Sequence, residues 1–202
     1  KLCDYVKDMS VFVQNTGRIE NMHDLTHIKT NYPRKPSEHL AAVTPQQLPD
    51  LFYALECKPR VYGVVWNAMM VQFYTLSRPG EIAEMKWDWI DFDNDVIRFP
   101  AEIMKTGRVH EVPMSKQLKI LLMGMPRVYE YVFTSDHFKR KGEPINRESV
   151  RLMFSKAGLG GIQTAHGIRS IGATWLAEQG IREDVAELCL AHSSDNQCKI
   201  HD

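Results

Sequence analysis

Residues 164–180 read TAHGIRSIGATWLAEQG, and this stretch predicts an amphipathic helix with polar groups at its start. Thr164 can serve as the N-cap, and Gly180 can end the helix in a left-handed conformation. Four apolar residues recur at helical spacing and are expected to form the buried stripe: Ile168, Ile171, Trp175 and Leu176. A helix of this kind needs a partner surface, so it predicts a helical domain around it.

His166 and Arg169 are three residues apart and therefore share a face in the first turn of that helix. The free backbone N–H groups and the helix dipole favour an anion at this place, and a phosphate would fit. Because an HxxR pattern is short, a solvated polar turn remains an alternative.

Upstream, residues 77–81 read SRPGE and place Arg78 between two predicted helices. The helix that begins after Arg78 again offers free amides beside a guanidinium. The alternative is an Arg78 that forms a surface ion pair with Glu81 or Glu84.

Residues 102–113 read EIMKTGRVHEVP and predict two strands, 102–105 and 109–113, around a turn at 106–108. Lys105 beside that turn could reach into a groove, although many hairpin lysines are only solvated. His192, in LAHSSDNQ at 190–197, follows a predicted helix whose dipole favours an imidazolium. A capping histidine is its alternative.

The five side chains Arg78, Lys105, His166, Arg169 and His192 together suit a phosphodiester. Two guanidiniums can hold the non-bridging oxygens of one phosphate, and lysine and histidine can supply protons or hydrogen-bond donors.

The remaining patterns predict an α+β fold that is mainly helical, with a small antiparallel sheet. Tyr74 is expected in the core of its helix, and residues 135–144 are expected to form an exposed basic loop. The other predicted elements are helices at 44–55, 62–76, 80–87, 116–123, 146–157 and 182–191 and a strand at 96–99.

The first 40 residues differ from the rest in their pattern. Residues 2–15 have helical spacing but lack partners of their own, and residues 21–40 are aperiodic and contain Pro33 and Pro36. We therefore predict a domain fragment with a linker at 1–40 and a whole domain at 41–202.

Composition sets modest limits on function. The 202 residues carry 25 basic and 25 acidic side chains, so nucleic-acid binding would need a local basic face. Four cysteines without a CxxC pair indicate reduced thiols and argue against a structural zinc site. No apolar run is long enough for a membrane span and no signal peptide is recognisable, so we expect a cytoplasmic protein without a membrane contact.

Several strings resemble the tyrosine recombinases, or phage-type integrases, and most closely the branch encoded by genomic islands. They are SRPGEIAEMKWDWID at 77–91, MKTGRVHEVPMS at 104–115, HGIRSIGATWLAEQG at 166–180 and LAHSSDNQ at 190–197. The resemblance covers residue 42 to the end and implies the tyrosine-recombinase catalytic fold. Residues 1 to about 30 resemble the end of the family's core-binding domain.

The resemblance implies roles for the five side chains. Arg78 and Arg169 would bind the scissile phosphate of DNA and stabilise its charge. Lys105 would be the general acid for the leaving 5′-hydroxyl, His166 would act as acid or base, and His192 would hydrogen-bond the phosphate. The implied partners are double-stranded DNA, three further copies of the chain in a tetramer, and accessory DNA-bending or directionality proteins. No cofactor is implied.

The family's nucleophile is a tyrosine, which forms a 3′-phosphotyrosyl intermediate. The position expected for it falls on His201 or Asp202, and neither is a tyrosine. Tyr74, Tyr129 and Tyr131 do not replace it. Truncation or loss of the tyrosine is favoured over its supply by a partner subunit.

Two other functions are open to this sequence. One is a non-catalytic DNA-binding protein that keeps the phosphate pocket. The other is a type IB topoisomerase, against which the short hairpin and the integrase-like strings argue.

Overall fold

The computed structural model describes residues 41–57, 63–135 and 140–192, all within one compact unit, Leu40–Asp202. The predicted helix at 2–15 and linker at 21–40 lie outside the described residues, as do His201 and Asp202.

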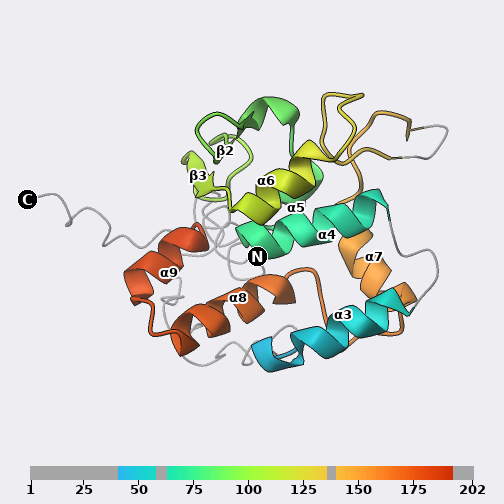
Figure 1. The fold of residues 1–202 in the computed structure, drawn as a ribbon, viewed down its shortest axis with the longest axis vertical. Helices are drawn as coiled ribbons and strands as arrows, with labels where there is room; N and C mark the ends of the chain where they lie inside the picture. The colour runs from blue at the N-terminus through green and yellow to red at the C-terminus, as the bar shows by residue number, and fades with distance from the viewer. Residues whose placement is uncertain (1–40, 58–62, 136–139, 193–202) are drawn as a thin grey trace, which may run out of the picture. The chain divides into compact units, whose positions relative to one another are not determined.

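Helix α4 lies at the centre of this unit and contacts the helices α3, α5, α6, α7 and α8 (Figure 1). The helices are α3 (Leu48–Glu56), α4 (Val64–Thr75), α5 (Pro79–Ala83), α6 (Lys116–Met123), α7 (Ser149–Lys156), α8 (Gly167–Glu178) and α9 (Glu183–Cys189). 3₁₀ turns include Pro45–Gln47 and Trp87–Trp89. The strands are β1 (Ile90–Asp91), β2 (Val96–Phe99) and β3 (His110–Pro113). The predicted fold class, mainly helical with a small antiparallel sheet, is confirmed.

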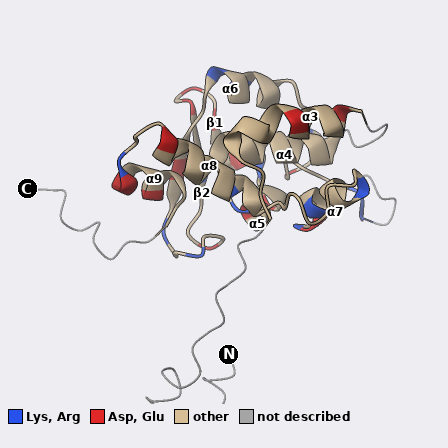
Figure 2. Cartoon of the chain, turned by 90° about the horizontal axis from the view of Figure 1, so that it is seen from below, with Lys and Arg blue, Asp and Glu red and all other residues tan. Residues whose placement is uncertain are grey.

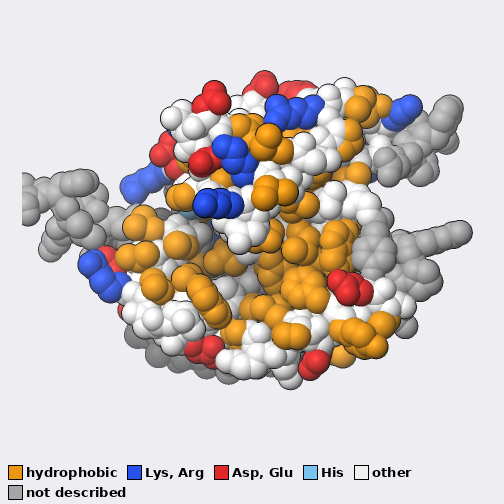
Figure 3. Space-filling model, viewed as in Figure 1, with side chains coloured by type: hydrophobic (Ala, Val, Ile, Leu, Met, Phe, Trp, Pro, Cys, Tyr) orange, Lys and Arg blue, Asp and Glu red, His pale blue; other side chains and the backbone are white. Residues whose placement is uncertain are grey.

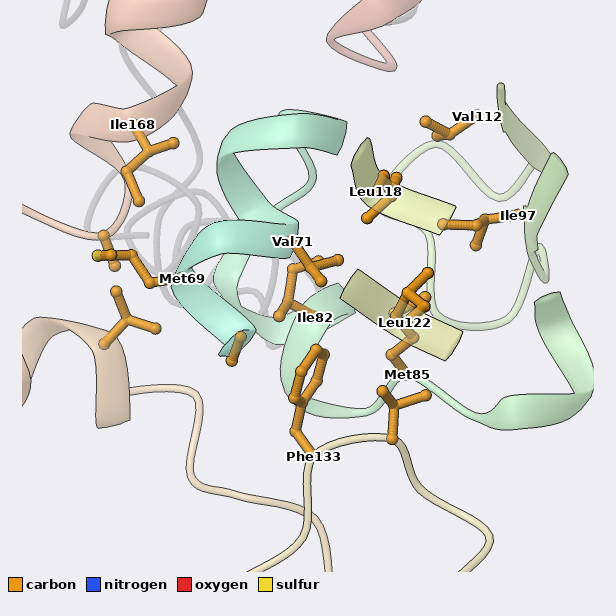
Figure 4. Close-up of a cluster of buried hydrophobic side chains, with 14 of the residues drawn as sticks. Met69, Val71, Ile82, Met85, Ile97, Val112, Leu118, Leu122, Phe133 and Ile168 are labelled. Atoms are coloured by element: carbon orange, nitrogen blue, oxygen red, sulfur yellow. The ribbon is translucent and has the colours of Figure 1, made fainter. Parts of the chain in front are cut away.

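The core forms where α4 meets its neighbours and the sheet. Met69 and Val71 of α4 are fully buried, in keeping with a helix that is apolar on most of its surface. Figure 4 shows these side chains beside Ile82 of α5, Leu118 and Leu122 of α6, and Ile168 of α8. α4 ends at Thr75, and Leu76 is its C-cap, with a left-handed φ of 52°.

The sheet has the order β1-β2-β3, with all pairs antiparallel. Ile97 pairs with Val112, and both are buried against the core. On the opposite face Arg98 binds Asp91 and Glu111, each at 2.8 Å. The alternation follows the two-residue period of a half-buried strand.

The hairpin around Lys105 differs from the prediction. β3 pairs with β2 rather than with residues 102–105, which lie in the long β2–β3 loop, 100–109. Pro100 cannot donate a ladder hydrogen bond, and two successive turns follow it, from Ile103 N–H to Pro100 O and from Met104 N–H to Ala101 O. The buried Met104 side chain anchors this loop to the core.

The helix predicted at 80–87 is also shorter than expected. α5 ends at Ala83, because the chain beyond it pairs with a distant segment. Lys86 forms a bridge with Tyr131, and Trp87 N–H donates to Glu130 O at 3.1 Å. α7 and α8 each begin three residues later than predicted, whereas the predicted 116–123 and 96–99 are reproduced as α6 and β2.

Two residues expected in the core are exposed instead. Tyr74 is 41% and Trp175 is 50% exposed. Both line an apolar groove of about 910 Å³ between the end of α4, β3, α8 and α9, which appears as the hollow with hydrophobic walls in Figure 3. The predicted apolar stripe of α8 is therefore buried only in the first half of the helix, at Ile168 and Ile171.

No helix in the described part is long and apolar enough to cross a membrane. Cys57 and Cys189 are free thiols, and no group of three metal-ligating side chains occurs among the described residues.

Candidate functional site

Three of the five predicted side chains line one polar cleft of about 510 Å³. They are Arg78 at the start of α5, Lys105 on the β2–β3 loop and His166 at the start of α8. Three elements that are distant in sequence therefore bring their functional groups to the same opening. Figure 2 marks basic residues in blue around α5 and α7 and acidic residues in red on α3 and α9.

Arg78 is fixed by the turn that starts α5. Glu81 accepts hydrogen bonds from the Arg78 backbone N–H and from its Nη1, both at 2.7 Å, and Nη2 donates to Ala191 O at 3.3 Å. The Glu81 pair considered from sequence exists, but it is not a surface pair, because the Glu81 side chain is only 3% exposed. The carboxylate therefore acts as a buried clamp on the guanidinium.

Arg169 lies behind this cleft and is 4% exposed. Its Nη1 donates to Leu76 O and its Nη2 to Leu190 O. Burial, and next the charge of Arg78, lower the Arg169 pKa to about 10, so the group stays charged at neutral pH. The two arginines bind the adjacent carbonyls of Leu190 and Ala191, which brings them together below the cleft.

His166 precedes α8 and has an exposed ring. Its pKa is lowered by partial burial first, and then by the charges of the four other predicted side chains. The Thr164 hydroxyl accepts from Gly167 N–H at 2.9 Å and so closes the turn before α8, but the N-cap of the helix is His166 and not Thr164 as predicted. At neutral pH the imidazole is neutral and can accept a proton.

A second, smaller opening is lined by His192 and by Thr106, the loop residue that follows Lys105. Lys105 is exposed on its loop, next to Gly107 with φ 64°. His192 Nδ1 lies 2.9 Å from Glu187 Oε2, and its ring lines a pocket of about 110 Å³ with Thr106 and His110. His192 thus neighbours the polar cleft without lining it.

Two groups near the site were missed from sequence. Arg147, before α7, lines the polar cleft, and no motif marked it. His110 is half-buried and stacks on Phe99, with ring centroids 6.4 Å apart. Burial lowers the His110 pKa most; Glu81 opposes this shift, while Arg169 and Arg78 add to it. The two-residue period of β3 places His110 on the same face as Val112 and could have indicated it.

The polar cleft carries more positive charge than the residues that line it suggest. Glu81, Glu84 and Glu148 stand beside Arg78, Lys105 and Arg147. However, Glu81 is bonded to Arg78, and Glu148 accepts from Arg151 Nε at 2.5 Å. Arg169 adds a further cation from behind. The arrangement can bind an anion through guanidinium and ammonium donors, with an imidazole placed for proton transfer.

Comparison with known protein structures finds the same fold in two DNA-bound integrases. A crystal structure of lambda integrase, a dimer bound to a core site, matches with a TM-score of 0.70 and 22% identity over 96% of this chain and 71% of that one. The integrase of the Tn1549 transposon, in complex with circular intermediate DNA, gives a TM-score of 0.71 and 16% identity over 96% and 70%.

Sequence relatives agree with this fold. Prophage integrase IntA of Escherichia coli (strain K12) is 33% identical, over 98% of this chain and 48% of the relative. The integrase of Shigella phage Sf6 is 34% identical, over 63% of this chain and 34% of the relative. The chain thus spans about half or less of these relatives. The profile described as "Phage integrase family" matches residues 42–201, and the chain therefore belongs to the phage integrase family.

Proposed function

We propose that this chain carries the catalytic domain of a site-specific DNA recombinase, which breaks and rejoins DNA strands to integrate or excise a mobile element. The observation that carries the proposal is the meeting of Arg78, Lys105 and His166 at one cleft, with Arg169 buried behind it. Family membership supports the same chemistry. The boundary near residue 40, with a fragment of a core-binding domain before it, is part of the proposal.

Each side chain has a distinct part in the proposed reaction. Arg78 and Arg169 bind the scissile phosphate and stabilise the charge of its transition state. Lys105 protonates the leaving 5′-oxygen from its exposed loop. His166, neutral at the start of α8, exchanges a proton with the nucleophile, and His192 donates a hydrogen bond to the phosphate. The chemistry needs no cofactor, because the covalent intermediate conserves the bond energy.

The proposed substrate is double-stranded DNA, and the proposed assembly on it is a tetramer. Solved integrases of this fold support both, since lambda integrase is described as a dimer on a core site and as a tetramer on a Holliday junction. Accessory DNA-bending or directionality proteins and a cytoplasmic location belong to the same proposal.

The nucleophile defines the alternative function. His201 and Asp202 occupy the positions where the resemblance expects a tyrosine, and both lie outside the described residues. If the native gene supplies no tyrosine there, the protein would hold a DNA phosphate without cutting beside it. It would then be an inactive, integrase-like DNA-binding protein.

The native coding sequence beyond Asp202 and the intact mass of its product decide between the two. The full product is then incubated with duplex DNA and separated under denaturing conditions, where covalent adducts remain joined. An active recombinase forms adducts that Arg169→Ala abolishes while much of the binding remains.

Arg182→Ala is the matched control, because the Arg182 side chain is 75% exposed and its one ion pair among the described residues is with the nearby Asp184. Adducts that survive Arg169→Ala would contradict the role of Arg169. Binding without any adduct, weakened by Arg169→Ala and by salt, would support the alternative.

A further inference from the structure

Gln72 is a fully buried polar side chain that none of the proposed roles uses. It lies in the last turn of α4 and is 0% exposed. Burial of a side-chain amide costs free energy unless the amide forms hydrogen bonds inside the protein. Its contacts therefore indicate what it does.

The Gln72 amide nitrogen joins two segments that are far apart in sequence. Nε2 donates to Ser77 O at 3.2 Å and to Ala165 O at 2.9 Å. Ser77 directly precedes Arg78, and Ala165 directly precedes His166. One NH₂ group thus uses its two protons on the backbone of the two turns that present the site.

The surrounding contacts follow the same pattern. Leu76 N–H donates to Gln72 O at 2.8 Å, and Leu76 O accepts from Arg169. The Arg78 turn is therefore linked to α8 twice, through the Gln72 amide and through the Arg169 guanidinium. Gln72 Oε1 and Ser77 Oγ have no hydrogen-bond partner among the described residues. The Gln72 side chain therefore forms its hydrogen bonds to other segments through its amide nitrogen.

We propose that Gln72 is a positioning residue that ties the Arg78 turn to the His166–Arg169 turn, so that both arginines act on the same phosphate. The inference rests on the proposed function, because it assumes that the bound anion is a DNA phosphate. Gln72 itself does not touch the DNA.

The test is a double-mutant cycle on DNA affinity. Arg78→Ala, Arg169→Ala and the double variant are made in the full native chain, and their binding to a mixed-sequence duplex is titrated at one fixed salt concentration. Two arginines on one phosphate should be non-additive, with a coupling factor of about tenfold. In a Gln72→Met background the same cycle should give a factor near one, because methionine fills a similar volume without the two N–H donors.

A control separates positioning from general destabilisation. Val71→Ala removes a fully buried side chain next to Gln72 on α4, so it should lower the thermal midpoint while leaving the coupling factor unchanged. If Gln72→Met does not fold, Gln72→Glu repeats the cycle, since it keeps the shape and replaces the amide donor by a carboxylate oxygen.

The outcomes are distinct. Loss of coupling in the Gln72 variant, but not in Val71→Ala, supports the inference. A coupling factor that stays the same in the Gln72 variant overturns it while leaving the proposed function intact. Unchanged duplex affinity in both single arginine variants would leave no coupling to lose and would overturn this inference, whereas the proposed function is decided separately by the covalent adducts.

Discussion

The polar cleft and the apolar groove meet at Leu76, yet they are built in opposite ways. Leu76 offers its carbonyl to Arg169 behind the cleft, and its side chain lines the groove. In the cleft, charged groups are fixed by buried contacts to backbone carbonyls and to Glu81. In the groove, Tyr74 and Trp175 have core-like chemistry but face an opening. Hydrogen bonds thus fix the positions of the charged groups in the cleft, whereas the groove is only a hollow between apolar side chains.

Among changes at the cleft and the groove, removal of the Arg169 guanidinium should have the largest effect on stability. Arg169→Ala leaves the buried carbonyls of Leu76 and Leu190 without this donor, which should cost about 3 kcal/mol in the free energy of unfolding. Urea denaturation of the variant and of Arg182→Ala gives the difference. A loss below about 1 kcal/mol would mean that water replaces the guanidinium and that the cleft is held otherwise.

Two glycines of α8 allow the start of the helix, next to His166, and its groove side to be compared directly. At Gly167 an added Cβ would lie 2.6 Å from Ala41 O, a backbone atom that cannot move alone. At Gly172 it would lie 2.4 Å from Leu76 Cδ2, the end of a flexible side chain. Gly167→Ala should therefore cost about 2–3 kcal/mol, and Gly172→Ala about 1 kcal/mol because Leu76 can turn away and alanine favours the helix.

Thermal unfolding of both alanine variants measures this order. If Gly172→Ala is the more harmful, the Leu76 side chain is held more rigidly than the open groove suggests. The Leu76 carbonyl bound by Arg169 would then be disturbed from the groove side as well, and DNA affinity should fall in parallel.

The groove itself should tolerate truncation. Trp175 is half exposed, so Trp175→Ala should cost about 1 kcal/mol, against about 2–5 kcal/mol for Leu122→Ala in the core. Chemical denaturation of the two variants compares them. A loss at Trp175 as large as that at Leu122 would show that the groove is covered in the folded chain.

Local patterns in the sequence predicted most elements, because those patterns have local causes. Ser115 caps α6 by accepting from Leu118 N–H at 3.2 Å, and the predicted boundaries of that helix are reproduced. The hairpin could not be predicted from local sequence, because β3 pairs with β2 and not with residues 102–105. The long loop between these two strands is held to the core by the buried Met104 side chain. The prediction that Tyr74 and Trp175 are buried was wrong for a related reason. Apolar periodicity indicates a face that favours burial, but not whether a surface covers it.

The candidate site was accessible from sequence only as a set of separate motifs. Nothing local indicates that the segments before Arg78 and His166 meet, and the link is the buried Gln72 amide of a third element. From sequence, Glu81 was considered as the partner of Arg78 in a surface ion pair, because a sequence does not show whether a side chain is buried in the folded chain. The roles of the five side chains stay a prediction until the variants are measured.

The smallest expected effect is a pH dependence that originates in the cleft. Surrounding protein lowers the pKa of His166 and of His110 below the ordinary value of 6.5, mainly by burial and by Arg169 and Arg78. Below pH 6.5 the unfolded chain therefore binds protons more readily than the folded one, and the free energy of unfolding should fall as the pH decreases through this range. Above it, neither state is protonated at these rings and the contribution is flat.

Replacement of both histidines by glutamine should reduce that slope. Asp91 and Asp184 also have lowered pKa values, but their carboxyls start from 3.8 and act in a more acidic range. Urea midpoints measured well above and moderately below pH 6.5 separate the two windows. An unchanged slope in the doubly substituted chain would mean that neither burial nor the cations of the cleft lower the pKa values of the two rings, and that His166 becomes available as a base only at higher pH than the site geometry implies.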